Sequence, residues 1–166
     1  MTLREELCPP KLEEEKVRTL KDLAERLDGC DSRLEDCTAL RTAFNSLAKT
    51  NLQTVDFHFS GAIDSDTFVR RVLTPRPRKV EDVSYEELLE LMTRICNAVG
   101  SDYELDYWLQ FLEVQLDNHK LSDLIYYPNE YFGDGTDRDE MTPKEILDTA
   151  IQHKPSIILL PPSNNL

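Results

Sequence analysis

Carboxylates gather with two glycines between Gly133 and Glu140, where the residue types would suit a divalent metal ion. The acidic members of this group are Asp134, Asp137, Asp139 and Glu140. A calcium loop of the EF-hand type needs acidic ligands at its first, third and fifth positions, glycine at the sixth and glutamate at the twelfth. The spacing here does not match that pattern. We interpret the segment as a solvated acidic loop, with a metal-dependent hydrolase as an alternative function.

Side chains suited to other catalytic chemistry form no recognisable arrangement. The histidines His58, His119 and His153 lie far apart, and none belongs to a Ser/His/Asp or Cys/His pattern. Structural or surface roles are therefore expected of them. The five glycines form no phosphate-binding loop. These observations predict that the protein is not an enzyme and that it binds no cofactor and no metal ion.

The four cysteines give no zinc-binding pattern. Cys8, Cys30, Cys37 and Cys96 include no CxxC pair and no paired histidine spacing, which argues against a metal centre. The first six residues include acidic side chains and no hydrophobic signal segment. We therefore expect a cytoplasmic protein, in which reduced thiols are the rule, although a bridge between Cys30 and Cys37 is an alternative.

Two adjacent tyrosines stand in the segment Ser122–Pro128, whose sequence is SDLIYYP. Proline disfavours helical geometry in the residue before it, so this segment can hold little more than one helical turn. One turn cannot bury both rings and both phenol oxygens, so at least one tyrosine is expected to face outward. Exposed tyrosine beside aspartate is typical of recognition surfaces. The alternative is a loop helix that packs both rings on its own domain.

The formal net charge of −13 is concentrated in the second half of the 166-residue chain. Residues 1–78 hold 13 Lys and Arg against 14 Asp and Glu, whereas residues 79–166 hold 6 against 18. Such a field repels nucleic acid and anionic membranes and speeds association with a basic protein. No apolar run approaches the roughly 20 residues needed to span a bilayer. We expect a basic protein partner, no nucleic acid and no membrane; simple solubility is the alternative role for the charge.

The domain boundary is predicted at Thr74–Lys79, whose sequence is TPRPRK. Two prolines one residue apart forbid a continuous helix and favour an exposed extended connector. The prediction is an N-terminal domain of residues 1–78, with no assigned role, and a second domain of residues 79–166. Neither half alternates apolar and polar residues with a period of two, so both are predicted to be helical.

Four helical segments are predicted in residues 79–166. Three begin with capping signals, which are Ser84 with Glu87, Ser101 with Glu104, and Thr142 with Pro143 and Glu145; the tyrosine segment is the other. Apolar side chains recur at helical spacing behind these starts: Tyr85, Leu88, Leu89, Met92, Ile95, Cys96 and Val99; then Leu105, Trp108, Leu109, Leu112 and Leu116; then Ile146, Leu147, Ala150 and Ile151. In residues 1–78, similar stripes predict a helix over 17–27, a second that Ser32 and Glu35 open and that runs to 47, and a third from Asp64 or Ser65 to 73.

Residues 83–152 resemble the colicin/pyocin immunity proteins, which inhibit nuclease bacteriocins. The similarity lies in the order of the helices, in Ile95-Cys96-Asn97-Ala98, in the core of the Ser122–Pro128 segment, and in a Thr-Pro opening where family members have Ser-Pro. The chain departs from the family in three places: a one-residue gap placed before the second helix, a longer loop over residues 129–140, and residues 1–78, which have no counterpart. The resemblance implies an all-α fold with a four-helix immunity-type bundle and a short third helix, preceded here by a small helical domain.

The resemblance also implies a partner and a binding surface. The partner would be the nuclease domain of a bacteriocin toxin, with a DNase as the expected class. The short third helix would supply a common anchor, and the second helix would supply selectivity. The corresponding residues are Ser122, Asp123, Tyr126, Tyr127 and Pro128 for the anchor, and Asp102, Leu105, Asp106, Leu109 and Glu113 for selectivity. Leu105 and Leu109 could instead be core residues. An acidic interaction module or DNA mimic is the alternative function.

Overall fold

The computed structural model describes residues 3–31, 33, 35–59, 63–135, 137–138 and 141–152. Every regular element among these residues is a helix, which confirms the all-α prediction. The chain divides into two compact units. One, the α1–α3 unit, comprises Cys8–Arg76 with Asp102–Glu104; the other, the α4–α8 unit, comprises the remaining residues. None of the described helices combines the length and the apolar character that a bilayer crossing requires.

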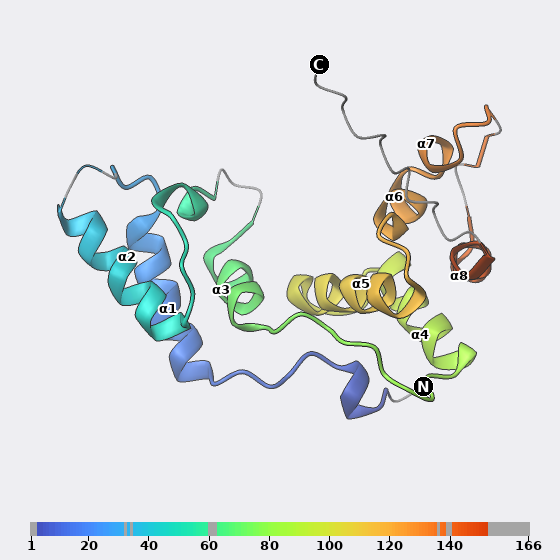
Figure 1. Cartoon of the computed structure of the whole chain (residues 1–166), viewed down its shortest axis with the longest axis horizontal. Helices are drawn as coiled ribbons and strands as arrows, with labels where there is room; N and C mark the ends of the chain where they lie inside the picture. Colours follow the sequence, from blue (N-terminus) through green and yellow to red (C-terminus); the bar gives the residue numbers. More distant parts are fainter. Residues whose placement is uncertain are drawn as a thin grey trace, which may run out of the picture. The chain divides into compact units, whose positions relative to one another are not determined.

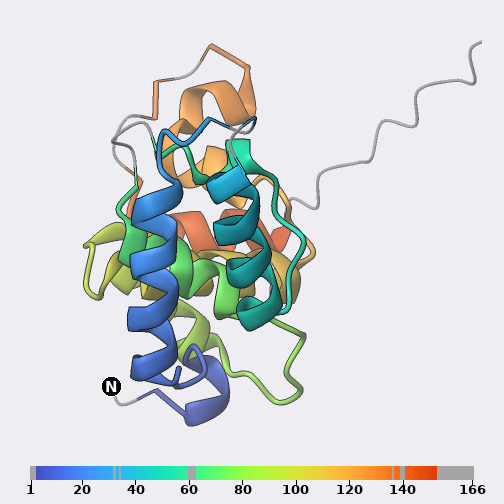
Figure 2. The same cartoon turned by 90° about the vertical axis from the view of Figure 1, so that its left-hand side faces the viewer.

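The α1–α3 unit is built on two antiparallel helices, α1 (Glu14–Leu27) and α2 (Glu35–Ala48), which lie side by side in both views (Figures 1 and 2). The shorter α3 (Ser65–Leu73) and a 3-10 turn at Thr54–Phe57 complete the unit. Its buried core consists of the residues Val17, Leu20, Ala24, Leu27, Phe44, Phe57, Phe59 and Val69. The three predicted helices are therefore present. Ser32, predicted to open the second helix together with Glu35, lies outside the described residues, and α2 begins at Glu35.

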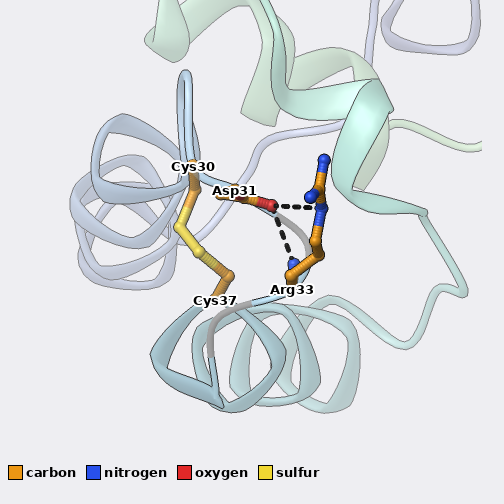
Figure 3. The surroundings of a disulfide bond; sticks show 4 residues. All are labelled: Cys30, Asp31, Arg33 and Cys37. Atoms are coloured by element: carbon orange, nitrogen blue, oxygen red, sulfur yellow. Dashed lines mark hydrogen bonds and ion pairs between the residues drawn. A yellow bond between two sulfur atoms is a disulfide. The ribbon is translucent and has the colours of Figure 1, made fainter.

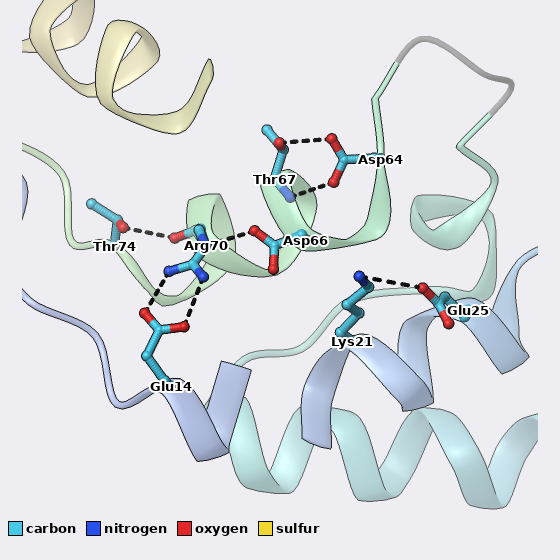
Figure 4. Close-up of polar contacts among 8 residues, drawn as sticks. All are labelled: Glu14, Lys21, Glu25, Asp64, Asp66, Thr67, Arg70 and Thr74. Carbon is cyan, nitrogen blue, oxygen red and sulfur yellow. Dashed lines mark hydrogen bonds and ion pairs between the residues drawn. The ribbon is translucent and has the colours of Figure 1, made fainter. Parts of the chain in front are cut away.

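Polar contacts secure α3 in this unit (Figure 4). The carboxylate of Asp64 accepts a hydrogen bond from the backbone N–H of Thr67 at 2.9 Å, which confirms the predicted N-cap. This hydrogen bond is the main reason that the pKa of Asp64 is lowered. Arg70 then joins α3 to α1, because its guanidinium donates to both carboxylate oxygens of Glu14 at 2.9 and 2.8 Å and to Asp66 at 2.6 Å.

Cys30 and Cys37 form a disulfide between the end of α1 and the first turns of α2 (Figure 3). The expectation of reduced thiols at these two positions is therefore wrong. The physical reason is the helix–loop–helix turn, which brings the two Cα atoms to 6.1 Å, within the range that a disulfide can bridge. Disulfides persist mainly in oxidising compartments. This bond therefore gives no support to the predicted cytoplasmic location.

Five helices form the frame of the α4–α8 unit (Figure 1). Their bounds are α4 (Tyr85–Cys96), α5 (Asp102–Leu116), α6 (Leu121–Tyr126), α7 (Pro128–Phe132) and α8 (Pro143–Gln152). Ser84 and Glu87 form the predicted capping box of α4. The backbone N–H groups of Thr142 and Glu145 bond each other's side chains at 2.8 and 3.3 Å, as the Thr-Pro opening of α8 predicts.

The core of this unit draws on every helix except α7. Its buried members are Leu7, Leu88, Leu91, Met92, Ile95, Trp108, Phe111, Leu112, Leu121, Leu124, Ile146, Leu147 and Ala150. The predicted stripes omitted Leu91 and Phe111, both fully buried, and included Val99, which is 53% exposed. Leu91 and Phe111 were missed because these helices are covered on more than one face, whereas Val99 lies beyond the end of α4 at Cys96.

Two features of this unit differ from the predicted organisation. Residues 3–7 group with the α4–α8 unit, whereas the sequence assigned them to a domain of residues 1–78. The second feature is α7, which makes five α-helices among the described residues of 79–152, where four were predicted in residues 79–166. Pro128 ends α6 as expected, but it also occupies the first turn of α7, where a missing N–H costs nothing. Gly133 ends that helix in the left-handed conformation at a φ of 61°.

Candidate functional site

The tyrosine pair faces outward from the end of α6. Leu121 and Leu124 are fully buried, and they anchor one face of this six-residue helix in the core. Tyr126 and Tyr127 lie beyond that face, with exposed fractions of 57% and 59%. The sequence required at least one exposed ring, and the structure exposes both. The alternative of a loop helix that buries its rings is therefore wrong.

Tyr127 stands at a fixed corner of the backbone between two helices. Its N–H donates to the carbonyl of Asp123 at 2.8 Å and so closes the last turn of α6. Its carbonyl accepts the N–H groups of Glu130 and Tyr131, each at 3.0 Å, and so opens α7. Because the same residue ends one helix and begins the next, the direction of its side chain is set by both. An exposed ring on such a backbone loses little conformational entropy on binding.

The carboxyl of Glu113, on α5, is partly buried. Burial raises its pKa above the ordinary value, and the charges of Asp106 and Asp123 act in the same direction. The charge of His119 and the backbone of Ser122 act against this rise. Glu113 is therefore a partly buried acidic residue whose charge interacts with residues of both α5 and α6.

Asp106 lies seven residues before Glu113 on α5, about two helical turns away. Its charge affects the ionisation of the Tyr126 phenol. The pKa of the Tyr126 phenol is raised, first by partial burial and then by the nearby Cys96 and Asp106. Asp106 accepts a hydrogen bond from the side chain of Gln110 at 3.0 Å. The charge of Asp106 thus acts on an exposed phenol whose raised pKa keeps its proton at neutral pH, so that this phenol can donate a hydrogen bond.

The structure thus brings together two groups of residues that are separate in the sequence. We call the group an acidic tyrosine surface and define it by Asp106, Glu113, Ser122, Asp123, Tyr126 and Tyr127. Asp123 is exposed and Ser122 is partly buried. Pro128, also predicted as a binding residue, is partly buried at the start of α7. The surface offers hydrogen-bond acceptors, negative charge and two aromatic rings, and it presents no nucleophile paired with a base.

Three residues predicted on the selectivity helix have different positions. Leu105 and Leu109 are partly buried and pack against the core of the α4–α8 unit, which favours the core interpretation for both. Asp102 is exposed in the first turn of α5, a turn that groups with the α1–α3 unit. We therefore leave these three residues out of the acidic tyrosine surface.

The acidic loop after α7 is held by ion pairs. Arg138 donates to both oxygens of Asp134, at 2.6 and 2.8 Å, and its guanidinium lies 4.0 Å from the centre of the Phe132 ring. Asp139 and Glu140 lie outside the described residues. Within the described part of the chain, no group of three or more His, Cys, Asp or Glu side chains could hold a metal ion.

An open pocket of about 410 Å³ lies between this loop and α8. Its lining includes Arg138, Glu145 and Asp148, and each of these charges already has an internal partner. Glu145 bonds Thr142, and Asp148 accepts hydrogen bonds from Tyr85 and Lys144 at 2.7 and 2.6 Å. These three charged side chains of the lining are therefore all paired within the chain.

Comparison with protein-family models, with curated proteins and with solved structures finds no match to this chain. The resemblance over residues 83–152 therefore rests on the sequence motifs alone.

Proposed function

We propose that this chain is a bacteriocin immunity protein, which binds and inhibits the nuclease domain of a colicin/pyocin-type toxin. The toxin class expected from the resemblance is a DNase. One observation carries the proposal: two adjacent tyrosines are both more than half exposed, at a hydrogen-bonded corner between α6 and α7 that follows the exposed Asp123 in the last turn of α6. No catalysis is required of the chain, and the surface contains no arrangement that would perform it.

Two physical properties of this surface suit a nuclease partner. Exposed tyrosines supply large apolar contact with few rotatable bonds, and such side chains contribute a large share of binding energy at protein interfaces. The carboxylates supply the other property. A nuclease domain must present Lys and Arg to bind phosphates, so the acidic field attracts it and pairs with the same groups.

Inhibition would follow from position and charge. The resemblance implies that the inhibitor sits beside the active site of the toxin and excludes nucleic acid by its bulk. A protein region with 6 basic and 18 acidic residues adds electrostatic repulsion of the phosphate backbone to that steric effect. The mechanism then needs only a stable complex, because substrate cannot approach while the complex persists.

The direct experiment is a DNA-cleavage assay with the nuclease domain of the toxin encoded beside this gene, in the presence of increasing amounts of the purified chain. We expect complete inhibition at a one-to-one ratio, and loss of inhibition when Tyr126→Ala and Tyr127→Ala are combined. The matched control is Tyr85→Ala, since Tyr85 is also exposed, at 36%, but bonds Asp148 on α8. Undiminished cleavage at a large excess of the wild-type chain would rule out the proposal for a DNase.

The acidity supports a second candidate, a DNA mimic without a dedicated toxin. In that case the carboxylates would be sufficient, and the tyrosines would matter little. The two candidates predict different partner ranges. Equal binding to several unrelated DNA-binding proteins, unaffected by the double tyrosine variant, would favour the mimic, whereas binding to one nuclease domain that depends on the tyrosines favours the immunity protein.

A further inference from the structure

An open polar pocket of about 350 Å³ lies in the α1–α3 unit, between the second half of α2 and the segment that follows this helix. Its lining includes Arg41, Asn45 and Ser46 of α2, and Thr50 and Gln53 of the following segment. Every lining residue that the structure describes is polar, and none of them is acidic. The volume lies at the lower end of the range for small-molecule sites. A lining of this kind binds by hydrogen bonds and charge, so its ligand would be a small polar molecule.

Asn45 fixes the segment that forms one side of this pocket. Its side-chain amide donates to the carbonyl of Leu52 and accepts the N–H of Leu52, both at 2.9 Å. The backbone carbonyl of Asn45 accepts the N–H of Thr50 at 3.0 Å, and Lys49 takes the left-handed conformation at a φ of 56°. These are the features of a Schellman motif, which ends a helix with its last carbonyls satisfied. The two sides of the pocket are therefore held together before any ligand binds.

Arg41 brings a positive charge to the pocket without a carboxylate partner. Its Nη1 group donates to the side-chain oxygen of Gln53 at 3.3 Å, and no acidic residue of the described part of the chain pairs with it. Arg70 of the same unit differs, because Glu14 and Asp66 both accept hydrogen bonds from it. A guanidinium has five N–H groups in a plane. Because Arg41 bonds only a neutral amide, its charge and its remaining N–H groups stay available to a ligand.

The charge balance of this half of the chain is compatible with an anionic ligand. Residues 1–78 hold 13 basic and 14 acidic residues, so they lack the strong acidic excess of residues 79–166. The planar N–H groups of a guanidinium match the two oxygens of a carboxylate. One guanidinium balances one negative charge, whereas a phosphate group at neutral pH carries about −1.5 to −2. The hydroxyls of Ser46 and Thr50 can each donate to or accept from hydroxyl groups of the same ligand.

We propose that this pocket binds a small carboxylate that carries hydroxyl groups, and that the guanidinium of Arg41 binds the carboxylate. The Gln53 side chain holds the guanidinium at the pocket, and Asn45 holds the segment that carries Gln53. The site is independent of the function proposed above. It gives the α1–α3 unit, to which the sequence assigns no role, a binding activity of its own.

The first experiment titrates the full, isotope-labelled chain with D-gluconate, with sorbitol and with inorganic phosphate, at constant ionic strength. Sorbitol has the same carbon chain as gluconate, with a hydroxymethyl group in place of the carboxylate. We expect gluconate to shift the amide resonances of Ser46, Thr50 and Gln53 along one saturable curve, with a dissociation constant of about 10 mM or lower. Sorbitol and phosphate should bind at least about tenfold more weakly. No saturable shift with gluconate, or binding of sorbitol or phosphate as tight as that of gluconate, would overturn the proposal.

The second experiment repeats the gluconate titration with variants of the guanidinium. Arg41→Gln removes the charge, and Arg41→Lys keeps the charge but loses the planar pair of N–H groups. The control, Arg18→Gln, removes the same charge from an exposed position on α1. We expect the affinity to fall at least about tenfold in Arg41→Gln and at least about threefold in Arg41→Lys, and to change less than about twofold in the control.

Circular dichroism melts establish that these variants are folded. Equal losses of affinity in Arg41→Gln and Arg18→Gln would show a general effect of net charge and would overturn the site. The titration of the wild-type chain tests the proposal even if a variant does not fold. Because neither experiment involves the toxin, failure of the immunity function leaves this test unaffected.

Discussion

The indole N–H of Trp108 donates a hydrogen bond to the backbone carbonyl of Leu7 at 3.0 Å, across 101 positions of the chain. Both residues are buried, with exposed fractions of 3% and 0%. Arg4 adds an ion pair of 2.6 Å to Glu87, the residue that closes the capping box of α4. The first described residues of the chain are therefore structural members of the α4–α8 unit.

The Leu7 side chain should be important for the stability of that unit. Leu7→Ala removes a fully buried leucine, a change that costs about 2–5 kcal/mol in a packed core. Urea unfolding followed by the fluorescence of the only tryptophan measures the loss. Glu6→Ala, at the exposed neighbouring position, is the control and should change stability by less than about 0.5 kcal/mol. Equal stability of the two variants would show that residues 3–7 do not belong to the core.

The disulfide should stabilise the α1–α3 unit. Cross-linking Cys30 to Cys37 closes a short loop, and the loop-entropy relation gives about 2.5 kcal/mol for this length. We expect paired Cys30→Ser and Cys37→Ser substitutions to lower the melting temperature by several degrees. Thiol titration of the unfolded, unreduced protein should detect the two cysteines outside this disulfide, Cys8 and Cys96. Four reactive thiols without reductant would contradict the bond.

Each tyrosine of the pair should contribute strongly to partner binding. Tyr126→Ala and Tyr127→Ala are each expected to weaken the complex by more than about 2 kcal/mol, as buried aromatic residues at interface centres do. Folding should survive, because both rings are more than half exposed in the free protein. Isothermal calorimetry gives the affinities and circular dichroism gives the folded fraction. If the affinity falls by less than about tenfold in both variants, the tyrosines are not central contacts of the interface.

The acidic field should govern how fast the complex forms. Association should be fast at low salt and much slower at high salt, while dissociation changes less. Asp106→Lys should slow association further, because it places a positive charge within the surface that meets a basic partner. Asp22→Lys, on an exposed face of α1, makes the same charge change in the other unit and serves as the control. If the stopped-flow association rate does not change with ionic strength, the acidic charge does not steer binding and serves only solubility.

The α4–α8 unit should lose stability at low pH because Glu87 becomes protonated. The backbone N–H of Ser84, and then Arg4, lower the pKa of this carboxyl below its usual 4.5. A carboxyl with a lowered native pKa stabilises the fold above the unfolded value, and that contribution is lost as the pH falls through the native value. Melting temperatures between pH 7 and pH 3 should therefore drop less steeply in Glu87→Gln than in the wild type. Parallel curves would contradict this role.

Local chemistry explains the features that the sequence predicts correctly. Ser84 with Glu87, Thr142 with Glu145, and Asp64 each cap a helix within three residues, so the sequence alone specifies where those helices begin. The outward position of the tyrosines is also local. A segment ended by Pro128 is too short to bury two rings, whatever surrounds it.

The sequence by itself therefore determined the helical class, most helix starts and the exposure of the tyrosine pair. Only the tertiary structure decided that Leu7 fills the core beside Trp108, that Cys30 bonds Cys37, and that Arg70 joins α3 to Glu14 of α1. Helical periodicity identifies which face of a helix is apolar but carries no information about which distant residue covers it. Those contacts depend on how the elements pack around one core, because many pairings satisfy the same local pattern and packing selects one of them.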